Sequence, residues 1–413
     1  MWQRTKNIYH LGIAIISNAW LRFPSRKLIV IGVTGTDGKT TTTSLIYHIL
    51  NSAGFNTSMV SSIGAVIGGV SYDIGFHVTT PSSFALQSFL SRAVASGKRS
   101  SPNFLVLETT SHALDQYRVF GIKFEIGVLT NITHEHLDYH KTYENYVKTK
   151  AKLLKMAKVA ITNRDDESYA SLSSKFKLQS SKLRTYGMNK DADFNPKSFP
   201  FKTNLIGEFN KYNVLAAITV CRELKISDDK IRSGIKSFIA PLGRGDIVYD
   251  KEFAIMIDFA HTPNAIDQIL GAIRPSIKGR LIHVFGSAGQ RDTSKRPLMG
   301  KSSSKYADVI ILTSEDPRSE SVEKIMNEIA SGIQNSKFKI QNYNSKLKIK
   351  DGKKSLFKIG DRRDAINAAI KMAKKGDFII ITGKSHEKSM NYGQGEIAWD
   401  EYEVVREGLR IKD

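Results

Sequence analysis

Residues 28–42 read Leu28-Ile29-Val30-Ile31-Gly32-Val33-Thr34-Gly35-Thr36-Asp37-Gly38-Lys39-Thr40-Thr41-Thr42, an apolar run followed by a glycine-rich turn and a threonine-rich segment. The run predicts a buried strand, and the segment after the turn predicts the start of a helix. Gly35 and Gly38 allow the turn to direct backbone N–H groups at an anion, and the helix adds its positive N-terminal end. Lys39 would then reach the β- and γ-phosphates, and Thr40 would offer a hydroxyl to Mg²⁺. The stretch therefore predicts an ATP-phosphate loop in an α/β protein.

The length of 413 residues predicts two or three domains with an ample core, and the apolar and charged fractions are those of an ordinary soluble globular protein. Cys221 is the single cysteine, so neither a disulfide nor a cysteine-based metal site is available. It lies in an apolar helical pattern, where a small buried side chain is expected. These features favour a protein of the reducing cytoplasm.

The net charge of +21 raises the alternative of a polyanionic partner such as nucleic acid. The lysines, however, are dispersed along the chain. The clusters at residues 148–152 and 346–354 lack interleaved aromatic residues and a reading helix. The sequence therefore favours a solvated basic surface without a nucleic-acid partner, and such a surface also suits phosphorylated and carboxylated substrates.

The segment from Ile8 to Trp20 is apolar and follows Arg4 and Lys6, as the apolar part of a signal peptide does. It is too short to span a bilayer, has no small-residue cleavage site and leads directly into the first strand. We expect residues 1–27 to form a short helical segment that packs on the protein, without stable membrane insertion. Association with a membrane surface is the weaker alternative.

Further apolar runs alternate with helical patterns, which predicts largely parallel sheets. One series lies at 104–107, 126–129 and 159–162, and a second at 253–257, 281–285, 309–313 and 378–382. Pro241 and Gly243 interrupt the pattern between the two series. We therefore expect a central ATP-binding domain over residues 28–240 and a C-terminal Rossmann-like α/β domain over residues 241–413. The polar stretch 171–202 predicts irregular structure.

Polar residues follow two strands of the first series. Glu108 lies at the end of one strand, on the carboxyl edge where open parallel sheets bind ligands, and is a candidate Mg²⁺ ligand. After the next strand come His134, His136 and His140, which raise a zinc site as an alternative. Phosphate-bound Mg²⁺ needs few protein ligands, so magnesium is favoured and some of these histidines are expected to be hydrogen-bonded structural residues.

The order of motifs along the chain resembles the Mur ligases, the ATP-dependent enzymes that add amino acids to peptidoglycan precursors. The loop has their form Thr-Gly-Thr-x-Gly-Lys-Thr-Thr, with Val33 where the strict P-loop pattern has glycine. Within that family the chain resembles the UDP-N-acetylmuramoyl-tripeptide synthetases, which add the third residue of the stem peptide. The motifs that carry this resemblance are Thr79-Thr80-Pro81 and residues 108–118, 136–140, 145–150, 205–213, 258–263, 295–300 and 383–387.

The resemblance implies a set of residues around ATP and Mg²⁺. The ATP-binding residues it implies are Gly35, Thr36, Asp37, Gly38, Lys39, Thr40, Thr41, Asn210, Asn213, Arg244, Asp258 and His261. The implied metal ligands are Thr40, Glu108, His136 and Lys150, with Lys150 carboxylated by CO₂ on its amine. The implied catalytic residues are Lys39, Glu108, His136, Lys150 and Arg244, of which Arg244 would neutralise charge on the transferred phosphoryl group. From the residues alone, Lys150 as a plain surface lysine and Arg244 as part of an interdomain salt bridge remain open.

The resemblance also implies two substrate sites. The residues implied for a muramoyl-dipeptide acceptor are Thr79, Thr80, Thr110, Gln116 and Arg118. Those implied for the incoming diamino acid are Arg291, Glu315, Asp316, Arg318, Gly383 and Glu387. Arg318 implies meso-diaminopimelate over lysine, because a guanidinium can hold the distal carboxylate through two hydrogen bonds, and Glu387 suits the distal ammonium.

Two observations weigh against that use of Arg318. Asp316 stands where the family usually has asparagine, so its charge would compete for the guanidinium. Alternatively, Arg318 only pairs with Glu315, Asp316 or Glu320, as charges around a turn often do.

The resemblance does not extend to the family's N-terminal uridine-binding domain, because only 27 residues precede the first apolar run. The carrier of the acceptor therefore stays open between UDP, UDP bound with the help of a partner's domain, and another muramoyl carrier. Apart from such a partner, we expect a monomer.

The implied reaction phosphorylates the acceptor carboxyl with ATP to give an acyl phosphate, which the incoming amine then displaces to form an amide bond. One alternative is a ligase of the same fold with another acceptor, either a non-UDP muropeptide or a folylpolyglutamate-type substrate. A more distant alternative is a nucleic-acid-stimulated P-loop ATPase.

Overall fold

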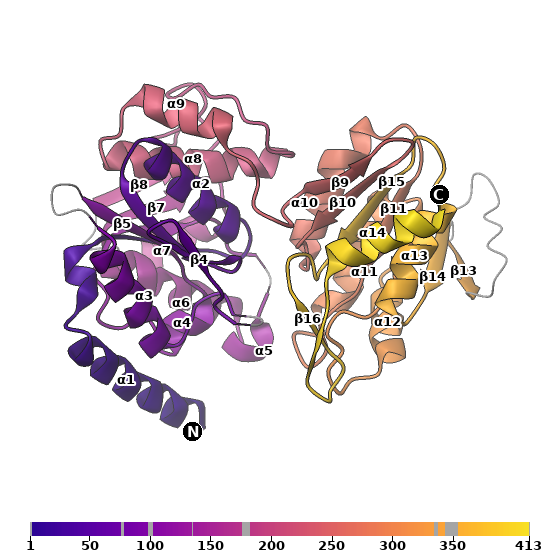
Figure 1. Cartoon of the computed structure of the whole chain (residues 1–413), viewed down its shortest axis with the longest axis horizontal. Coiled ribbons are helices and arrows are strands. Elements are labelled where there is room, and N and C mark those ends of the chain that lie inside the picture. The colour runs from indigo at the N-terminus through magenta and orange to yellow at the C-terminus, as the bar shows by residue number, and fades with distance from the viewer. Residues whose placement is uncertain are drawn as a thin grey trace. The chain divides into compact units, whose positions relative to one another are not determined.

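The computed structural model describes residues 2–75, 78–97, 102–133, 135–175, 182–333, 338–342 and 354–412. The chain divides into two compact units. Unit 1 contains residues 1–133 and 139–239, and unit 2 contains residues 134–138 and 240–413. In Figure 1, unit 1 runs from indigo to rose and unit 2 continues to yellow.

Unit 1 is built around a sheet in the order β4-β3-β2-β5-β1-β6-β7-β8. Its strands are β1 (Ile29–Thr34), β2 (Asn56–Ser61), β3 (Gly64–Ile67), β4 (Val70–Tyr72), β5 (Asn103–Glu108), β6 (Phe124–Leu129), β7 (Ala157–Asn163) and β8 (Lys182–Tyr186). Its helices are α1 (Trp2–Trp20), η1 (Pro24–Lys27), α2 (Lys39–Ser52), α3 (Ser83–Ala95), α4 (Ser111–Asp115), α6 (Tyr143–Met156), α7 (Ser168–Lys175), α8 (Glu208–Glu223) and α9 (Asp228–Ser237), with the short α5 (Leu137–His140) at the junction with residues 134–138. The neighbouring strands in the part of the sheet ordered β2-β5-β1-β6-β7-β8 are parallel. At the other edge, β3 pairs antiparallel with β2, and β4 pairs antiparallel with β3.

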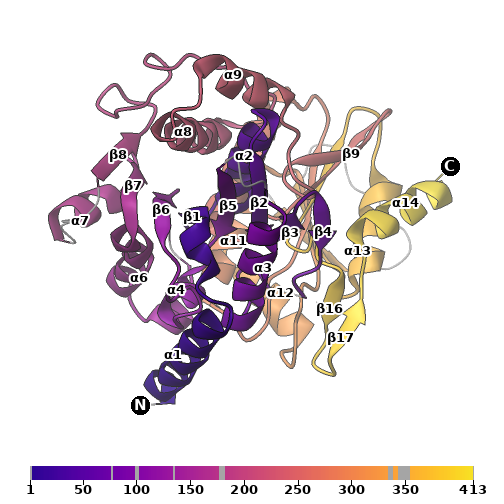
Figure 2. The ribbon, with the colours of Figure 1, turned by 60° about the vertical axis from the view of Figure 1, so that its left-hand side comes forward.

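Helices cover both faces of this sheet, so its central strands are apolar on both sides. Ile31 and Val33 of β1 pack in the core formed with α2, α8 and α9. Val30 points to the opposite core, which contains residues of α3 and α6. Figure 2 shows the two helical layers on either side of the strands. The buried strand β1 thus holds the phosphate loop at its carboxyl end.

Unit 2 has a second sheet in the order β13-β14-β12-β11-β15-β10-β9. Its strands are β9 (Asp246–Asp250), β10 (Ala254–Asp258), β11 (Leu281–Phe285), β12 (Val309–Leu312), β13 (Phe338–Asn342), β14 (Lys354–Lys358) and β15 (Phe378–Thr382), with a separate hairpin of β16 (Ser389–Asn391) and β17 (Glu396–Ala398). Its helices are α10 (Pro263–Ile273), η2 (Arg274–Ser276), α11 (Lys295–Tyr306), α12 (Val322–Ser331), α13 (Arg362–Met372) and α14 (Glu401–Lys412). In this sheet β9 alone is antiparallel to its neighbour, and α13 and α14 cover one face.

The α/β class with largely parallel sheets is confirmed, and both series of apolar runs are strands. The expectation that residues 171–202 include irregular structure is confirmed for residues 187–202, but the sequence did not indicate a strand elsewhere in the stretch 171–202. This stretch contains β8, which pairs in parallel with β7. β8 is an edge strand, and its charged side chains Lys182 and Arg184 pair with Glu223 of α8. The strand therefore lacks the apolar run by which the other strands were predicted.

Candidate active site

The phosphate loop turns sharply between β1 and α2. Gly35 and Gly38 have φ values of 152° and 79°. A Cβ at Gly35 would lie 1.7 Å from Thr130 Oγ1, and one at Gly38 would lie 2.3 Å from Asn213 Oδ1. Glycine is therefore required at both positions by the close approach of neighbouring side chains, and at Gly38 also by its left-handed backbone.

The residues between these glycines are fixed by the segment that follows β6. Asn131 accepts a hydrogen bond from Thr36 N on its carbonyl at 2.8 Å and one from Asp37 N on Oδ1 at 2.9 Å. Lys39 lies over the same loop and donates from Nζ to Thr36 O at 2.7 Å. Thr41 is buried in the first turn of α2. The loop is thus held in shape by protein contacts alone.

Thr40 and Glu108, two expected metal ligands, lie together at the carboxyl ends of β1 and β5. Thr40 Oγ1 is 3.2 Å from Glu108 Oε1 and 2.9 Å from Ser62 Oγ. Ser62 N also donates to Glu108 Oε2 at 3.0 Å. Glu108 is only 1% exposed, and within the described ranges no cationic side chain pairs with it. A buried carboxylate beside two hydroxyls is the kind of oxygen set that Mg²⁺ binds.

Lys150 reaches the same loop from α6. It is 1% exposed and donates from Nζ to Gly35 O at 2.6 Å, above the ring of Tyr146. The alternative of a plain surface lysine is therefore wrong. Lys148, two residues earlier on the same helix, is exposed. The helix turns only Lys150 of these two towards the phosphate loop.

Asn210 and Asn213 lie on the first turns of α8, next to the loop. Asn213 Nδ2 donates to Asn210 Oδ1 at 2.8 Å, and Asn213 Oδ1 accepts from Thr42 Oγ1 at 3.3 Å. Asn210 in turn donates to Ile206 O at 2.7 Å. Asn213 Oδ1 would lie 2.3 Å from a Cβ added at Gly38, so the two asparagines are beside the glycine-rich loop.

The expected acceptor residues also come together in unit 1. Thr80 Oγ1 donates to Glu108 O at 3.0 Å and accepts from Thr110 N at 3.0 Å. Arg118 donates to Thr80 O at 2.9 Å and to Gln116 Oε1 at 2.7 and 3.1 Å. Thr79 precedes Thr80 on the same loop. These side chains therefore adjoin the backbone of Glu108 at the end of β5.

The remaining residues that were expected to bind the nucleotide belong to unit 2. Asp258 ends β10 and accepts from Gly245 N and Ala260 N, each at 2.7 Å. Burial raises the pKa of the Asp258 carboxyl, although the nearby charge of Arg244 opposes the shift. Arg244 itself stacks on the ring of Phe259 at 4.4 Å. These contacts fix Arg244 and Asp258 around one turn.

His136 and His261 lie in unit 2 around a buried carboxylate, that of Glu135. Glu135 Oε1 is 3.2 Å from His261 Nε2 and 3.5 Å from Lys295 Nζ, and Oε2 is 3.7 Å from His136 Nε2. Burial alone would raise the pKa of Glu135, but these positive neighbours hold it well below its usual value. The hydrogen bond to Glu135 raises the pKa of His261 despite burial.

The three-histidine stretch includes His134, which lies outside the described residues. His140 is buried against Ser111 Oγ at 3.0 Å, and burial lowers its pKa to about 4. No trio of His, Cys, Asp or Glu side chains in the described part of the chain is placed to hold a metal ion.

A cluster of buried charges lies where β12 and β15 end in unit 2. Lys384 Nζ donates to both oxygens of Asp316, at 2.9 and 3.0 Å, and pairs with Glu387 at 2.7 Å. Asn391 N also donates to Asp316 Oδ1 at 2.9 Å. Lys384 and Asn391 are thus hydrogen-bonded to the Asp316 carboxylate, whose charge also acts on Arg318.

Arg318 lies beside this cluster, and the alternative in which it only pairs with Glu315, Asp316 or Glu320 is not observed among the described residues. It donates from Nη1 to Gly289 O, and within the described residues it makes no ion pair. Glu320, one of the candidate partners, pairs with Arg296. Burial, followed by the charge of Arg291, lowers the pKa of Arg318. The charges of Asp316, Glu396 and Glu387 act on Arg318 in the opposite direction. Two guanidinium groups without a direct ion pair would favour a carboxylate ligand.

Glu315 and Gly383 complete this group. Gly383 has φ 109°, and a Cβ there would lie 2.2 Å from Glu315 Oε2. That oxygen is buried without a hydrogen-bond partner among the described residues. Burial raises the pKa of Glu315 although Arg362 opposes it. The expected residues Glu315, Asp316, Gly383 and Glu387 are therefore brought together.

The sequence analysis missed Ser62, Glu135 and the role of Lys384. Ser62 follows β2 without any motif, and only the parallel pairing of β2 with β5 brings it to Glu108. Lys384 stands inside a quoted motif, but nothing local in the sequence indicates its partner Asp316.

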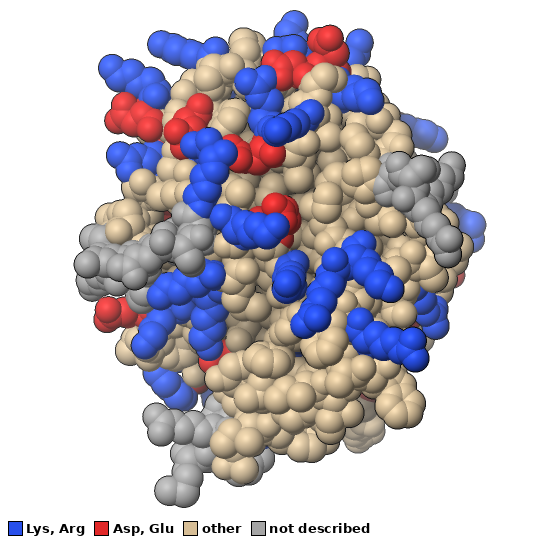
Figure 3. Space-filling view, turned by 90° about the vertical axis from the view of Figure 1, so that its left-hand side faces the viewer, with Lys and Arg blue, Asp and Glu red and all other residues tan. Residues whose placement is uncertain are grey.

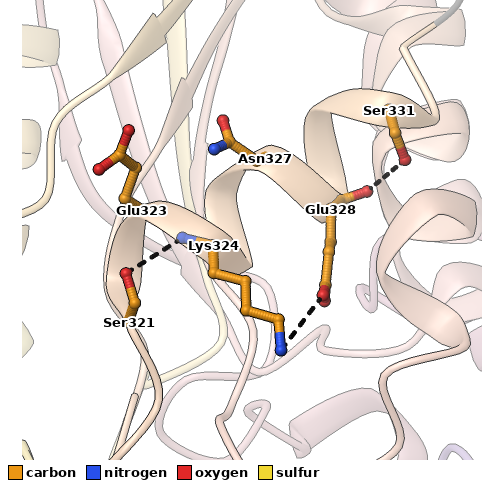
Figure 4. A pocket seen from close by; sticks show the side chains of 6 residues that line it. All are labelled: Ser321, Glu323, Lys324, Asn327, Glu328 and Ser331. Carbon is orange, nitrogen blue, oxygen red and sulfur yellow. Dashed lines mark hydrogen bonds and ion pairs between the residues drawn. The ribbon is translucent and has the colours of Figure 1, made fainter.

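A surface pocket lies apart from these residues, along α12. Ser321 Oγ accepts from Lys324 N at 3.3 Å, and Lys324 lies 4.0 Å from Glu328 (Figure 4). All six lining residues come from α12 and its N-cap: Ser321, Glu323, Lys324, Asn327, Glu328 and Ser331. None is an expected site residue, so the pocket is not part of the candidate site.

Two family profiles match the chain, the Mur ligase middle domain over residues 33–221 and the Mur ligase, glutamate ligase domain over residues 243–385. The UDP-N-acetylmuramoyl-L-alanyl-D-glutamate–2,6-diaminopimelate ligase of Aquifex aeolicus is 39% identical over 404 residues, 94% of this chain and 78% of that protein. The chain belongs to the Mur ligase family. Like its relatives, this Mur ligase is an ATP-dependent, ADP-forming ligase.

Solved structures resemble this Mur ligase as well. A UDP-N-acetylmuramoyl-L-alanyl-D-glutamate–2,6-diaminopimelate ligase matches with a TM-score of 0.58 and 29% identity, covering 93% of this chain and 79% of that one. The folylpolyglutamate synthase of Mycobacterium tuberculosis, solved with ADP and AMPPCP, matches with a TM-score of 0.67 and 16% identity, covering 90% and 92%. The second likeness shows a shared fold only.

Proposed function

We propose that this Mur ligase adds meso-diaminopimelate to UDP-N-acetylmuramoyl-L-alanyl-D-glutamate, with conversion of ATP to ADP and phosphate. The observation that carries this proposal is the pair of positive charges at Arg318 and Arg291, neither of which forms an ion pair within the described residues, while Lys384 is hydrogen-bonded to the nearby Asp316. Diaminopimelate differs from lysine by a distal carboxylate, which a guanidinium can bind through two parallel hydrogen bonds. Relatives 34–39% identical to this chain carry the same activity in their names.

The loop in unit 1 fits the phosphates of ATP. Gly35 and Gly38 let the turn pass close to Thr130 and Asn213, and the N-terminus of α2, which begins at Lys39, offers backbone N–H groups to an anion. Lys39 would exchange its contact with Thr36 O for the β- and γ-phosphates. Asn210 and Asn213 would lie on the adenine side of the loop.

The oxygens of Thr40, Ser62 and Glu108 fit Mg²⁺, which when bound neutralises phosphate charge and orients the γ-phosphoryl group. Arg118, Thr80 and Thr110 would orient the acceptor so that its terminal carboxylate meets that phosphoryl group. The carboxylate oxygen forms a bond to phosphorus, ADP leaves, and the uncharged amine of the amino acid then displaces phosphate from the acyl carbon. Lys39 and Arg244 would stabilise the negative charge that moves during the first step.

Within the amino acid site, Lys384 positions two carboxylates at once. Its Nζ lies 2.9 Å from the Asp316 carboxylate and 2.7 Å from the Glu387 carboxylate. We infer that the distal ammonium of the substrate shares the Glu387 carboxylate with Lys384. Arg318 and Arg291 would receive the carboxylate at the same end of the substrate.

We further infer that Lys150 is carboxylated in the active enzyme. Its amine is buried beside Gly35 O, so loss of a proton and addition of CO₂ would place an anion next to the phosphate loop, where it could bind the metal. Intact mass at near-neutral pH in bicarbonate should show an added CO₂ on the native protein that Lys150→Ala lacks. Lys150→Ala should lose ligation and regain part of it with added short carboxylates, whereas Lys148→Ala should behave like wild type. Full activity of Lys150→Ala would refute the inference.

The function is tested by measuring ADP release with a panel of acceptors and amino acids. The expected result is release that requires both the UDP-linked muramoyl-dipeptide and meso-diaminopimelate, with formation of the tripeptide confirmed by mass spectrometry. Release with the same dipeptide lacking UDP would instead identify another carrier. Release with a folate acceptor and glutamate, or stimulation by polynucleotide alone, would overturn the proposal.

A further inference from the structure

Helix α1 has its apolar side turned away from the protein. Ile8, Tyr9, Ile15, Ile16 and Trp20 expose between 50% and 76% of their surface. They recur at the spacing of one helical face, together with the small Gly12 and Ala19. Helices of globular proteins normally bury their apolar face, whereas α1 exposes its apolar face to solvent.

The other side of α1 is polar and holds the helix to unit 1. Asn18 Nδ2 donates to Phe120 O at 2.8 Å, and Asn7 Nδ2 donates to Asp115 Oδ2 at 3.1 Å. Ala14, Ser17 and Asn18 are buried. Figures 1 and 2 show α1 running beside α3 with its outer side uncovered. Specific side-chain contacts therefore orient the helix so that the apolar face points outward.

The surroundings of the exposed face are basic. No acidic residue precedes Asp37 in the chain. Lys6, Arg22, Arg26 and Lys27 are exposed within or just after α1. In Figure 3 the lower part of the visible face, which α1 occupies, is uncharged, and mainly Lys and Arg side chains border it. An apolar face bordered by cations is complementary to a surface that is apolar inside and anionic outside.

We propose that α1 lies flat on an anionic lipid bilayer, with Ile8, Ile15, Ile16 and Trp20 between the acyl chains and the flanking basic residues at the lipid phosphates. Tyr9 and Trp20 are amphipathic aromatic residues of the kind that favours the bilayer interface. The attachment is peripheral, because no helix in the described ranges has the length and apolarity to cross a membrane. A second copy of the chain fits less well, since a symmetric pair would bring the same cations together without acids to meet them.

The face lies next to the expected acceptor site. Asp115, which accepts the hydrogen bond from Asn7, directly precedes Gln116 and also accepts from Tyr139 at 2.9 Å. Burial and the charge of Arg118 lower the pKa of His10 on α1. A membrane at α1 would thus adjoin the segment of residues 111–118, whichever acceptor this segment binds.

The test is co-sedimentation of the full-length protein with vesicles of phosphatidylcholine alone and with one third phosphatidylglycerol. Ile16→Asp is compared with Ile411→Asp, a substitution of an equally apolar and exposed residue on α14 that adds the same charge. The wild type should bind the anionic vesicles, Ile16→Asp should bind at least about tenfold more weakly, and Ile411→Asp should match the wild type. Circular dichroism of both variants should match the wild type, because neither side chain packs in a core.

A second measurement locates the contact. Tryptophan fluorescence should shift to the blue on addition of anionic vesicles, and Trp20→Phe should reduce that shift. Absence of wild-type binding, or equal binding by the two aspartate variants, would overturn the proposal, the latter showing mere attraction of a basic protein to acidic lipid. A dimer in light scattering that Ile16→Asp dissociates, without vesicle binding, would assign the face to a second copy instead.

Discussion

The phosphate loop of unit 1 and the charged cluster of unit 2 use different physical means to prepare for a ligand. The loop relies on backbone geometry, with glycines where side chains would clash and with N–H groups at the start of α2. The cluster relies on side chains from distant segments, such as Asp316 and Lys384, which are buried together. Phosphate can be recognised by a local turn, whereas a diamino acid with charges at both ends requires separated charges held in fixed positions.

The comparison predicts that unit 1 depends on one side chain for chemistry but not for folding. Lys39→Ala should lower the rate of ADP release roughly a thousandfold to ten-thousandfold, about 4–5 kcal/mol, because the charge at the β- and γ-phosphates is lost. The melting temperature should stay within experimental error, since the only described contact of Lys39 Nζ is to Thr36 O. Lys148→Ala is the matched control, and comparable turnover by the two variants would contradict the assignment of the loop.

In unit 2, by contrast, we expect the loss of one buried charged side chain to lower the stability of the fold. Arg362 and Glu401 form a bidentate pair at 2.6 and 2.8 Å with both side chains fully buried, and Arg362 also donates to Ser314 O and Thr382 O at the ends of β12 and β15. Glu401→Ala should lower the free energy of unfolding by about 3–4 kcal/mol, because an unpaired guanidinium remains buried.

The same two helices supply the control for that measurement. Arg363 and Glu407 pair across α13 and α14 with both side chains largely exposed. Glu407→Ala should cost less than about 1 kcal/mol in urea denaturation followed by circular dichroism. Equal losses in the free energy of unfolding for Glu401→Ala and Glu407→Ala would show that burial of the Arg362–Glu401 pair does not make it more important for stability than the exposed pair.

The choice of amino acid should depend on a third side chain. Arg318→Ala should reduce the preference for meso-diaminopimelate over lysine by about 30-fold to 150-fold, about 2–3 kcal/mol, because a half-buried bidentate contact with the distal carboxylate is lost. A competition assay with both amino acids measures this ratio by mass spectrometry of the products. Lys301→Ala, on the exposed side of α11, serves as control. Predominant incorporation of lysine by the wild type would refute the role of Arg318.

The smallest expected effect is a loss of folding stability at low pH, caused by a buried histidine in unit 2. His283 lies between Ser303 Oγ at 2.9 Å and Thr382 Oγ1 at 3.0 Å, and burial lowers its pKa to about 3. The folded state therefore binds the proton less readily than the unfolded chain, whose pKa is about 6.5, so stability present above pH 6.5 is lost as the pH falls towards 3. Between pH 7 and pH 5 the loss should be on the order of 2 kcal/mol. His283→Gln should show a correspondingly weaker decline in urea denaturation, and an identical pH dependence would exclude His283 as its source.

Several site features followed directly from short stretches of sequence. The strand before the loop and the two glycines could be predicted because the turn that they form is local. Glu108 could be placed at a strand end because four apolar residues precede it. The incorrect expectations concern long-range partners. Asp316 was expected to compete for the guanidinium of Arg318, but its carboxylate is hydrogen-bonded to Lys384, 68 residues further along.

The sequence by itself determined the α/β class, the glycine-rich turn between β1 and α2, and the family to which the chain belongs, because apolar periodicity and glycine spacing act over a few residues. Only the tertiary structure decided which charges meet. Parallel pairing of β2 with β5 brings Ser62 to Glu108, and the order β12-β11-β15 lets segments after two non-adjacent strands join Asp316 to Lys384. It also decided that the apolar side of α1 faces outward, because the hydrogen bonds of Asn7 and Asn18 to residues more than 100 positions away fix the rotation of that helix.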